Sequence, residues 1–115
     1  MAEGTCASIV GLSNEILIAA MLEREQPVDW FVRSGLPLPS EETWRQMITK
    51  VQILVGMLKN TSGYLGDFHH AQVVNELGTV YLFPIGMQKV LCVVTKPQKQ
   101  NEVVDIVMKF MKNVK

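Results

Sequence analysis

Several features that mark common classes of protein are missing from this sequence of 115 residues. Eleven basic residues balance eleven acidic ones, so the chain has no positive excess for binding nucleic-acid phosphates. The longest apolar run, Ile16–Leu22, is far shorter than the about 20 residues that a membrane-spanning helix needs. The first residues, Met1–Gly4, lack the basic and apolar segments of a secretory signal. We therefore expect no nucleic-acid partner, no integral membrane contact and a cytoplasmic location.

Side chains that hold metals or perform catalysis are also sparse. Cys6 and Cys92 stand far apart without a C-x-x-C pair, which is typical of reduced thiols in a cytosolic protein. His69 and His70 are adjacent, and neighbouring residues of a strand point to opposite faces, so the two cannot chelate one metal together. The acidic residues around the second predicted strand, Asp29 among them, fit a solvated hairpin turn. With no glycine-rich phosphate loop either, the sequence predicts no cofactor, no metal site and no enzymatic activity.

What is present is a chain with 48% hydrophobic residues, arranged as one domain of alternating strands and helices. Residues 1–15 are expected to be a lead-in whose first helix is absent or short, around Ala7–Leu12, and residues 16–115 the domain. Turns of hairpin length separate the strands, which predicts an α+β fold with an antiparallel sheet in the order ββ-α-βββ-α. Strands are predicted over Ile16–Leu22, Val28–Val32, Asp67–Glu76, Thr79–Ile85 and a central Val90–Val94, and helices from an N-cap at Ser40 to about Lys59 and over Asn101–Lys115.

The central helix carries apolar residues on two faces. One stripe, at i, i+3, i+4 and i+7 spacing, suits a sheet and comprises Trp44, Met47, Ile48, Val51, Leu54, Val55 and Leu58. Ile53 and Met57 fall on the opposite side beside Gly56, which costs about 1 kcal/mol of helix propensity relative to alanine. Two stray apolar residues are common on monomers, whereas close packing of a partner's helix would also explain the glycine. The neutral net charge favours the second interpretation, so the helix predicts a dimer.

The order of elements and two motifs resemble the Roadblock family. Gly35-Leu36-Pro37-Leu38-Pro39 precedes the central helix, and Thr79-Val80-Tyr81-Leu82-Phe83-Pro84-Ile85-Gly86 is followed by a hydrophobic strand within Lys89–Lys96. This family includes the Roadblock light chain of dynein, bacterial polarity regulators and subunits of the Ragulator scaffold. The resemblance covers residues 16–114, and it implies a five-stranded antiparallel sheet with the central helix on one face and the terminal helices on the other. The chain departs from the family where a full first helix is expected.

The resemblance also implies partners. Roadblock proteins form homodimers or pair with a related subunit, with the third strands joined edge to edge and the central helices packed together. They commonly bind Ras-like small GTPases as scaffolds or regulators without an active site. Carried onto this chain, the dimer interface would comprise Ile53, Gly56, Met57, Phe68, His69, His70, Ala71, Gln72, Val73 and Val74. The small GTPase would meet Gln46, Thr49, Lys50 and Ile53.

Two other classes of function stay open at this point. A monomeric trafficking adaptor of the longin or profilin-like type would share the architecture and would stay monomeric in solution. A small-molecule sensor or enzyme would use the crevice between the helix and the sheet, and a deep polar pocket there would favour it.

Overall fold

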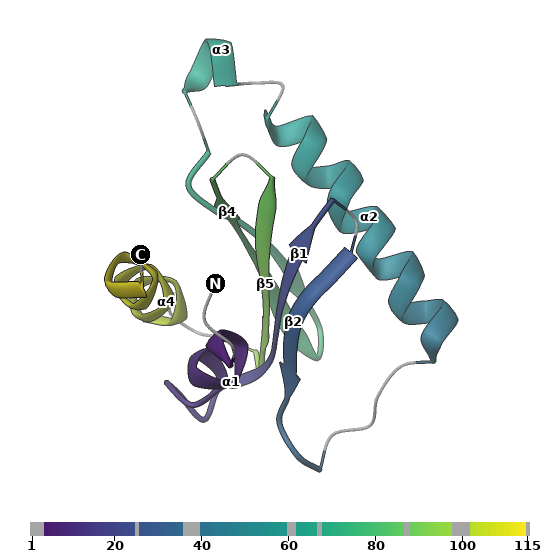
Figure 1. Ribbon diagram of the computed structural model, residues 1–115, viewed down its shortest axis with the longest axis vertical. Helices are drawn as coiled ribbons and strands as arrows, with labels where there is room; N and C mark the ends of the chain where they lie inside the picture. Colours follow the sequence, from purple (N-terminus) through teal and green to yellow (C-terminus); the bar gives the residue numbers. More distant parts are fainter. Residues whose placement is uncertain are drawn as a thin grey trace.

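A five-stranded antiparallel sheet organises the chain, with helices on both of its faces (Figure 1). The computed structural model describes residues 4–24, 26–35, 40–59, 62–66, 68–86, 88–97 and 102–114. The strands run in the order β2-β1-β5-β4-β3, so the fifth strand is central, as predicted. The strands are β1 (Ile16–Glu23), β2 (Gln26–Val32), β3 (Ala71–Asn75), β4 (Gly78–Ile85) and β5 (Lys89–Thr95), and the helices are α1 (Thr5–Val10), α2 (Glu41–Lys59), α3 (Ser62–Leu65) and α4 (Glu102–Val114). The predicted α+β architecture is confirmed.

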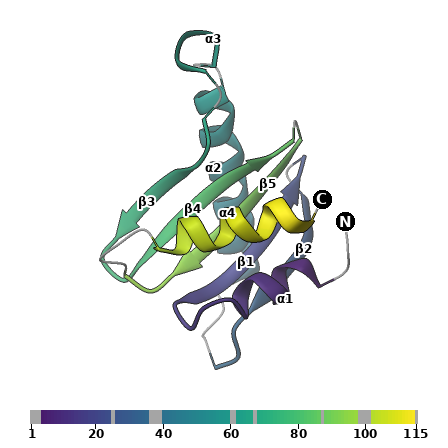
Figure 2. The ribbon, with the colours of Figure 1, turned by 90° about the vertical axis from the view of Figure 1, so that its left-hand side faces the viewer.

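The helices divide into two layers, again as predicted. Figure 2 shows α1 and α4 side by side in front of the sheet and α2 behind it. None of the helices in the described part of the chain is long and apolar enough to span a bilayer. The expected linker over 36–39 and the expected helix stop at Asn60-Thr61 lie outside the described residues.

The structure corrects the prediction between α2 and β4. The third strand begins at Ala71 and not at Asp67, because Phe68 turns inward to pack on Leu82 and its neighbours before the strand starts. A short helix, α3, occupies part of the segment that was expected to be a loop. Gly78 belongs to β4 and not to the turn, since it pairs with Asn75. A Cβ at Gly78 would come within 2.7 Å of the Thr95 carbonyl oxygen, so this close approach of two strands requires glycine.

The main core lies under α1 and α4. Its side chains come from both helices and from β1, β4 and β5, and the largest fully buried ones include Tyr81, Phe83, Ile9, Ile16 and Met21. A register shift between Ile16 and Ile18 turns Ile16 toward this face, while Ile18 faces α2. Of the two clusters of buried side chains in the described residues, the one in this layer is the larger.

Helix α1 belongs to the packed domain and is not a loose lead-in. It spans Thr5–Val10, and Cys6 and Ile9 within it are fully buried. The backbone N–H of Cys6 donates to Asp29 Oδ2 at 3.0 Å, so this carboxylate holds the first turn of the helix. Asp29 was expected in a solvated turn, but it lies in the β1–β2 ladder opposite Met21, within reach of the helix.

Arg33 holds the other end of α1. Its Nη2 donates to the carbonyl oxygens of Val10 at 2.7 Å and Ser13 at 2.8 Å, and its Nε donates to the Ile16 carbonyl oxygen at 2.9 Å. A cation at a helix C-terminus also opposes the negative end of the helix dipole. One guanidinium therefore ties the end of α1 and the start of β1 to the edge strand β2.

The layer under α2 is thinner. Its buried cluster comprises Val55, Leu82 and Val90, and half-buried apolar side chains pack against it. The helix starts as predicted, because the Thr43 N–H donates to the Ser40 Oγ at 3.2 Å and two glutamates occupy the first turn. The Arg45–Glu41 ion pair at 3.2 Å is highly exposed and adds little stability.

The Arg33 clamp gives the first prediction. Arg33→Lys keeps the charge but loses the planar fork that reaches three carbonyl oxygens, so it should lower the free energy of unfolding by about 1.5–3 kcal/mol. Chemical denaturation measures this loss, and amide hydrogen exchange should show faster opening of α1 than of β5. Uniform acceleration across both elements would contradict a clamp specific to α1.

A second prediction concerns alkaline pH. Burial, reinforced by the nearby Asp29 charge and a hydrogen bond to Asp29, raises the pKa of the Cys6 thiol from 9.0 to about 12. As the pH rises, the Cys6 thiol ionises in the unfolded chain before it does in the folded chain. The stability that the buried, neutral thiol contributes is therefore complete below pH 9 and falls as the pH rises toward 12. Cys6→Ala should therefore lose less stability than the wild type between about pH 8 and about pH 11, as measured by urea denaturation. Parallel losses in the two proteins would contradict the assignment.

Candidate interaction surface

Strand β3 forms an open edge of the sheet. It pairs with β4 on one side only, and every residue from Gln72 to Asn75 is exposed. Val74 is 72% exposed and Val73 is 42% exposed. Exposed apolar side chains on an edge strand favour association with another chain. This edge has the free backbone groups and the apolar side chains that a second strand would need.

The direction of the free backbone groups follows from the β3–β4 hairpin. Asn75 and Gly78 flank a two-residue turn, and in such hairpins the flanking pair exchanges hydrogen bonds. The ladder alternates from there, so Gln72 and Val74 direct their N–H and C=O groups away from β4. These two residues therefore present the groups available for pairing with another strand.

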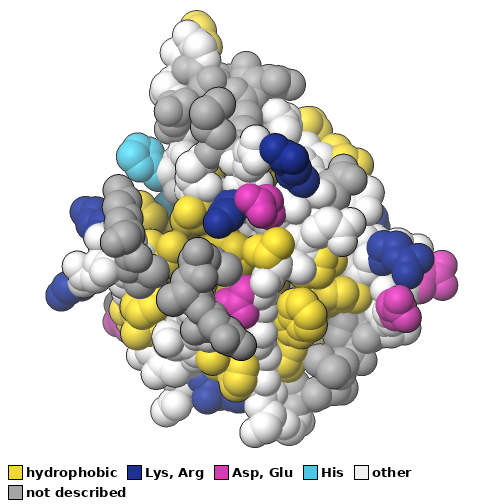
Figure 3. All heavy atoms as spheres, viewed as in Figure 1, with side chains coloured by type: hydrophobic (Ala, Val, Ile, Leu, Met, Phe, Trp, Pro, Cys, Tyr) yellow, Lys and Arg dark blue, Asp and Glu magenta, His cyan; other side chains and the backbone are white. Residues whose placement is uncertain are grey.

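The outer face of α2 is apolar toward its C-terminal end. Ile53 is 58% exposed and Met57 is 63% exposed, and a Cβ at Gly56 would meet nothing within 4 Å. Figure 3 shows hydrophobic side chains over this half of the helix, while charged side chains gather toward its start. The three residues predicted for helix packing thus lie free on the surface of this single chain.

Of the residues predicted to meet a small GTPase, Gln46, Thr49 and Ile53 lie on the same outer face and Lys50 lies at its border toward the sheet. Gln46, Thr49, Lys50 and Ile53 are all exposed. The Thr49 hydroxyl donates to the Arg45 carbonyl oxygen at 3.1 Å, an intrahelical bond that leaves the face accessible. The two predicted surfaces share Ile53, so they form one continuous strip along α2.

Three of the predicted interface residues lie before β3. Phe68 is half-buried and packs against the cluster of Val55, Leu82 and Val90. His70 is half-buried, with its ring centroid 6.1 Å from that of Phe83, whereas His69 is exposed. Phe68 and His70 thus contact their own chain, and the open edge is confined to the strand itself.

The sequence did not indicate several exposed apolar residues. Tyr64 and Leu65 on α3 are almost fully exposed, as is Leu77 in the β3–β4 turn. Trp30 and Phe31 are exposed on β2, the other edge of the sheet. Their exposure depends on the strand order and on the position of α3. Hydrophobic periodicity in the sequence contains no information about either.

Metal ligands and reactive thiols are the next groups to consider. Among the residues that the structure describes, no three His, Cys, Asp or Glu side chains come together as metal ligands. Burial raises the pKa of Cys92 to about 12, so this thiol and the Cys6 thiol stay protonated near neutral pH. Both are therefore poor nucleophiles at neutral pH.

Comparisons with known proteins identify the architecture. No protein-family model and no curated protein sequence matches the chain. Among solved structures, a Roadblock/LC7 domain from Streptomyces avermitilis superposes with a TM-score of 0.76 at 13% identity, covering 98% of this chain and 93% of that one. The gliding protein MglB from Thermus thermophilus gives a TM-score of 0.73 at 15% identity, covering 90% and 77%. MglC from Myxococcus xanthus gives 0.61 at 11% identity, covering 94% and 90%.

These similarities extend over nearly the whole chain, since the superpositions cover 90%, 98% and 94% of it. The chain has the Roadblock/LC7 fold.

Proposed function

We propose that this protein is a non-enzymatic scaffold that dimerises through β3 and α2 and binds a Ras-like small GTPase on the outer face of α2. The observation that carries the proposal is that one chain exposes both an unpaired, valine-bearing strand edge and an apolar helix face. Monomeric proteins usually protect such edges with charge, proline or a covering element. None of the described residues from Ala71 to Asn75 supplies one.

The edge suits pairing with an identical strand. Two antiparallel copies of β3 related by a two-fold axis would join two five-stranded sheets into one. Each would contribute the outward groups of Gln72 and Val74, and a closed two-fold dimer leaves no free copy of the patch to propagate. A structure reported as MglB with a tetrameric arrangement shares this fold at a TM-score of 0.74, which supports assembly as a use of the architecture.

The helix face supplies the second contact. Ile53, Gly56 and Met57 present two apolar side chains around a position without a side chain, so another helix can approach closely. The strip continues to Gln46, Thr49 and Lys50, which offer polar groups at the rim of this apolar centre. Interfaces commonly combine an apolar centre with a polar rim. The related subunit expected in a heterodimer would use the same strip.

The strand edge gives a prediction with a matched control. Gln72→Pro removes an outward N–H without removing a bond to β4, so it should turn a dimer into a monomer while the fold is kept. Gln72→Thr keeps the N–H and should stay dimeric. Light scattering after size exclusion reports the mass, and circular dichroism checks the fold. A wild-type chain that is monomeric at micromolar concentration would refute dimerisation and favour the longin-like adaptor.

The shared helix face gives another prediction. Ile53→Asp should abolish both dimerisation and small-GTPase binding, whereas Thr49→Asp should weaken GTPase binding and leave the dimer intact. Lys109→Asp, an exposed change on α4, should affect neither. The measurement is capture of Ras-like GTPases loaded with GDP or a non-hydrolysable GTP analogue, with the captured protein identified by mass spectrometry. Nucleotide-independent capture that Thr49→Asp does not alter would contradict the proposed site.

A further inference from the structure

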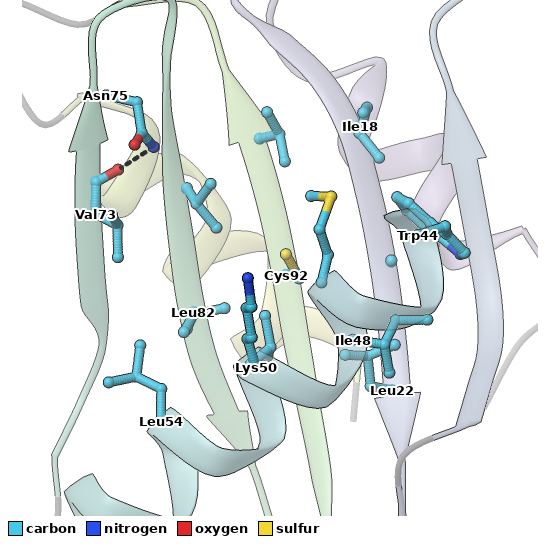
Figure 4. A pocket seen from close by; sticks show the side chains of 15 residues that line it. Ile18, Leu22, Trp44, Ile48, Lys50, Leu54, Val73, Asn75, Leu82 and Cys92 are labelled. Atoms are coloured by element: carbon cyan, nitrogen blue, oxygen red, sulfur yellow. Dashed lines mark hydrogen bonds between the residues drawn. The ribbon is translucent and has the colours of Figure 1, made fainter. Parts of the chain in front are cut away.

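An apolar groove lies between α2 and the sheet, on the inner side of the helix. Its volume is about 350 Å³, within the range of roughly 300–1,000 Å³ typical of small-molecule sites. Every side chain that lines it is hydrophobic except Lys50 and Asn75 (Figure 4). The groove runs along α2 from Trp44 to Leu54, eleven residues whose ten steps span about 15 Å of helix. It is therefore an elongated and almost entirely apolar site.

Small side chains on the sheet create the groove. Ala20 on β1 pairs with Cys92 on β5, and Cys92 pairs with Leu82 on β4, so two small residues lie side by side in its floor. The opposite face of the same strands carries Met21 and Leu91, a larger pair that is fully buried. The space under α2 thus follows from the residues chosen at one register position of the sheet.

The lining fits an apolar occupant. Atoms that face an unfilled apolar space lose the dispersion contacts that a packed neighbour would give. Met47 on α2 is unbranched and 40% exposed, so it can adapt to an occupant. The buried Cys92 thiol stays neutral because burial raises its pKa to about 12, and the floor therefore carries no charge.

Lys50, at the rim of the groove between Trp44 and Leu54, selects the charge of the occupant. Lys50 is exposed at the rim, and it forms no ion pair or hydrogen bond with any residue that the structure describes. The side-chain amide of Asn75 donates a hydrogen bond to the Val73 carbonyl oxygen of its own strand at 3.4 Å. No acidic side chain is among the lining residues. An anionic head group beside Lys50 would therefore meet a cation and no repelling charge.

We propose that the groove binds a free fatty acid, with the alkyl chain along α2 over Ala20 and Cys92 and the carboxylate beside Lys50. A linear alkyl chain suits an apolar groove that follows α2 for about 15 Å. Burial of the alkyl chain supplies most of the affinity, because an ion pair at an exposed lysine is weak. Lys50 determines the preference among head groups. Of the residues assigned to the scaffold surface only Lys50 and Val73 also line the groove, so this inference does not rest on the proposed scaffold function.

Trp44 in the groove wall provides the readout. The chain has two tryptophans, so Trp30→Phe leaves Trp44 as the only indole. In this background, dodecanoate below its micelle concentration should change the Trp44 fluorescence saturably, with one molecule bound per chain. Dodecyltrimethylammonium and dodecanol share the same alkyl chain and serve as matched ligands. Dodecanoate should bind several-fold more tightly than either.

Two variants separate the two parts of the site. Lys50→Glu should reverse the preference toward the ammonium ligand, and because Lys50 is exposed this change leaves the fold intact. Cys92→Leu fills the floor and should weaken binding of all three ligands by about tenfold or more. Circular dichroism of both variants verifies folding, and light scattering of the same samples reports the oligomeric state separately.

The result has clear contrary outcomes. Equal affinity for the three ligands, with no effect of Lys50→Glu, would overturn the assignment of the carboxylate to Lys50. If the Cys92→Leu variant is folded and binds the three ligands as tightly as the wild type, the groove is not the binding site. Association with anionic vesicles but not with monomeric dodecanoate would assign the surface to a membrane and overturn the proposal.

Discussion

The pairing of β5 with β1 on one side and β4 on the other is the constraint on which the rest of the structure depends. A strand in the middle of a sheet has no free edge, and both faces of this one are apolar, so each face must be covered. Helices α1 and α4 cover one face and α2 covers the other. The two layers differ because β4 presents the large Tyr81 and Phe83 to α1 and α4, whereas the small Ala20 and Cys92 lie side by side under α2.

The same strand order makes β2 and β3 the two edges, and the chain treats them differently. Strand β2 carries Asp29, and Arg33 follows it directly; their hydrogen bonds hold both ends of α1 close to that edge. Strand β3 carries no comparable attachment among the described residues, and its valines remain exposed. An edge whose side chains bind a helix is restrained, whereas a bare one favours pairing with another strand. This difference places the proposed dimer contact at β3.

The sequence predicted the elements better than it predicted the surfaces between them. Alternation, turn residues and the Ser40 cap were enough for five strands and the two long helices, because these signals are local. Phe68 was wrongly assigned to a strand. Its inward packing on Leu82 is a tertiary contact, which local sequence signals do not reveal. The back face of α2 was predicted from the positions of Ile53 and Met57 on the helix, and the structure leaves both exposed. The groove could not be predicted, because Ala20 and Cys92 become neighbours only once the register of β1 and β5 is known.

Helix α2 joins the two proposed surfaces physically. Of its side chains that the structure describes, Val55 alone is fully buried, so the position of the helix depends mainly on half-buried contacts. Its outer face carries the apolar strip and its inner face borders the groove. A molecule that binds only when α2 is in place stabilises that arrangement by mass action, whichever face it occupies. A bound partner would add contacts to a helix that has few buried ones of its own, which is a physical reason for proposing interaction surfaces on α2 and not on α1 and α4, whose side chains form the main core.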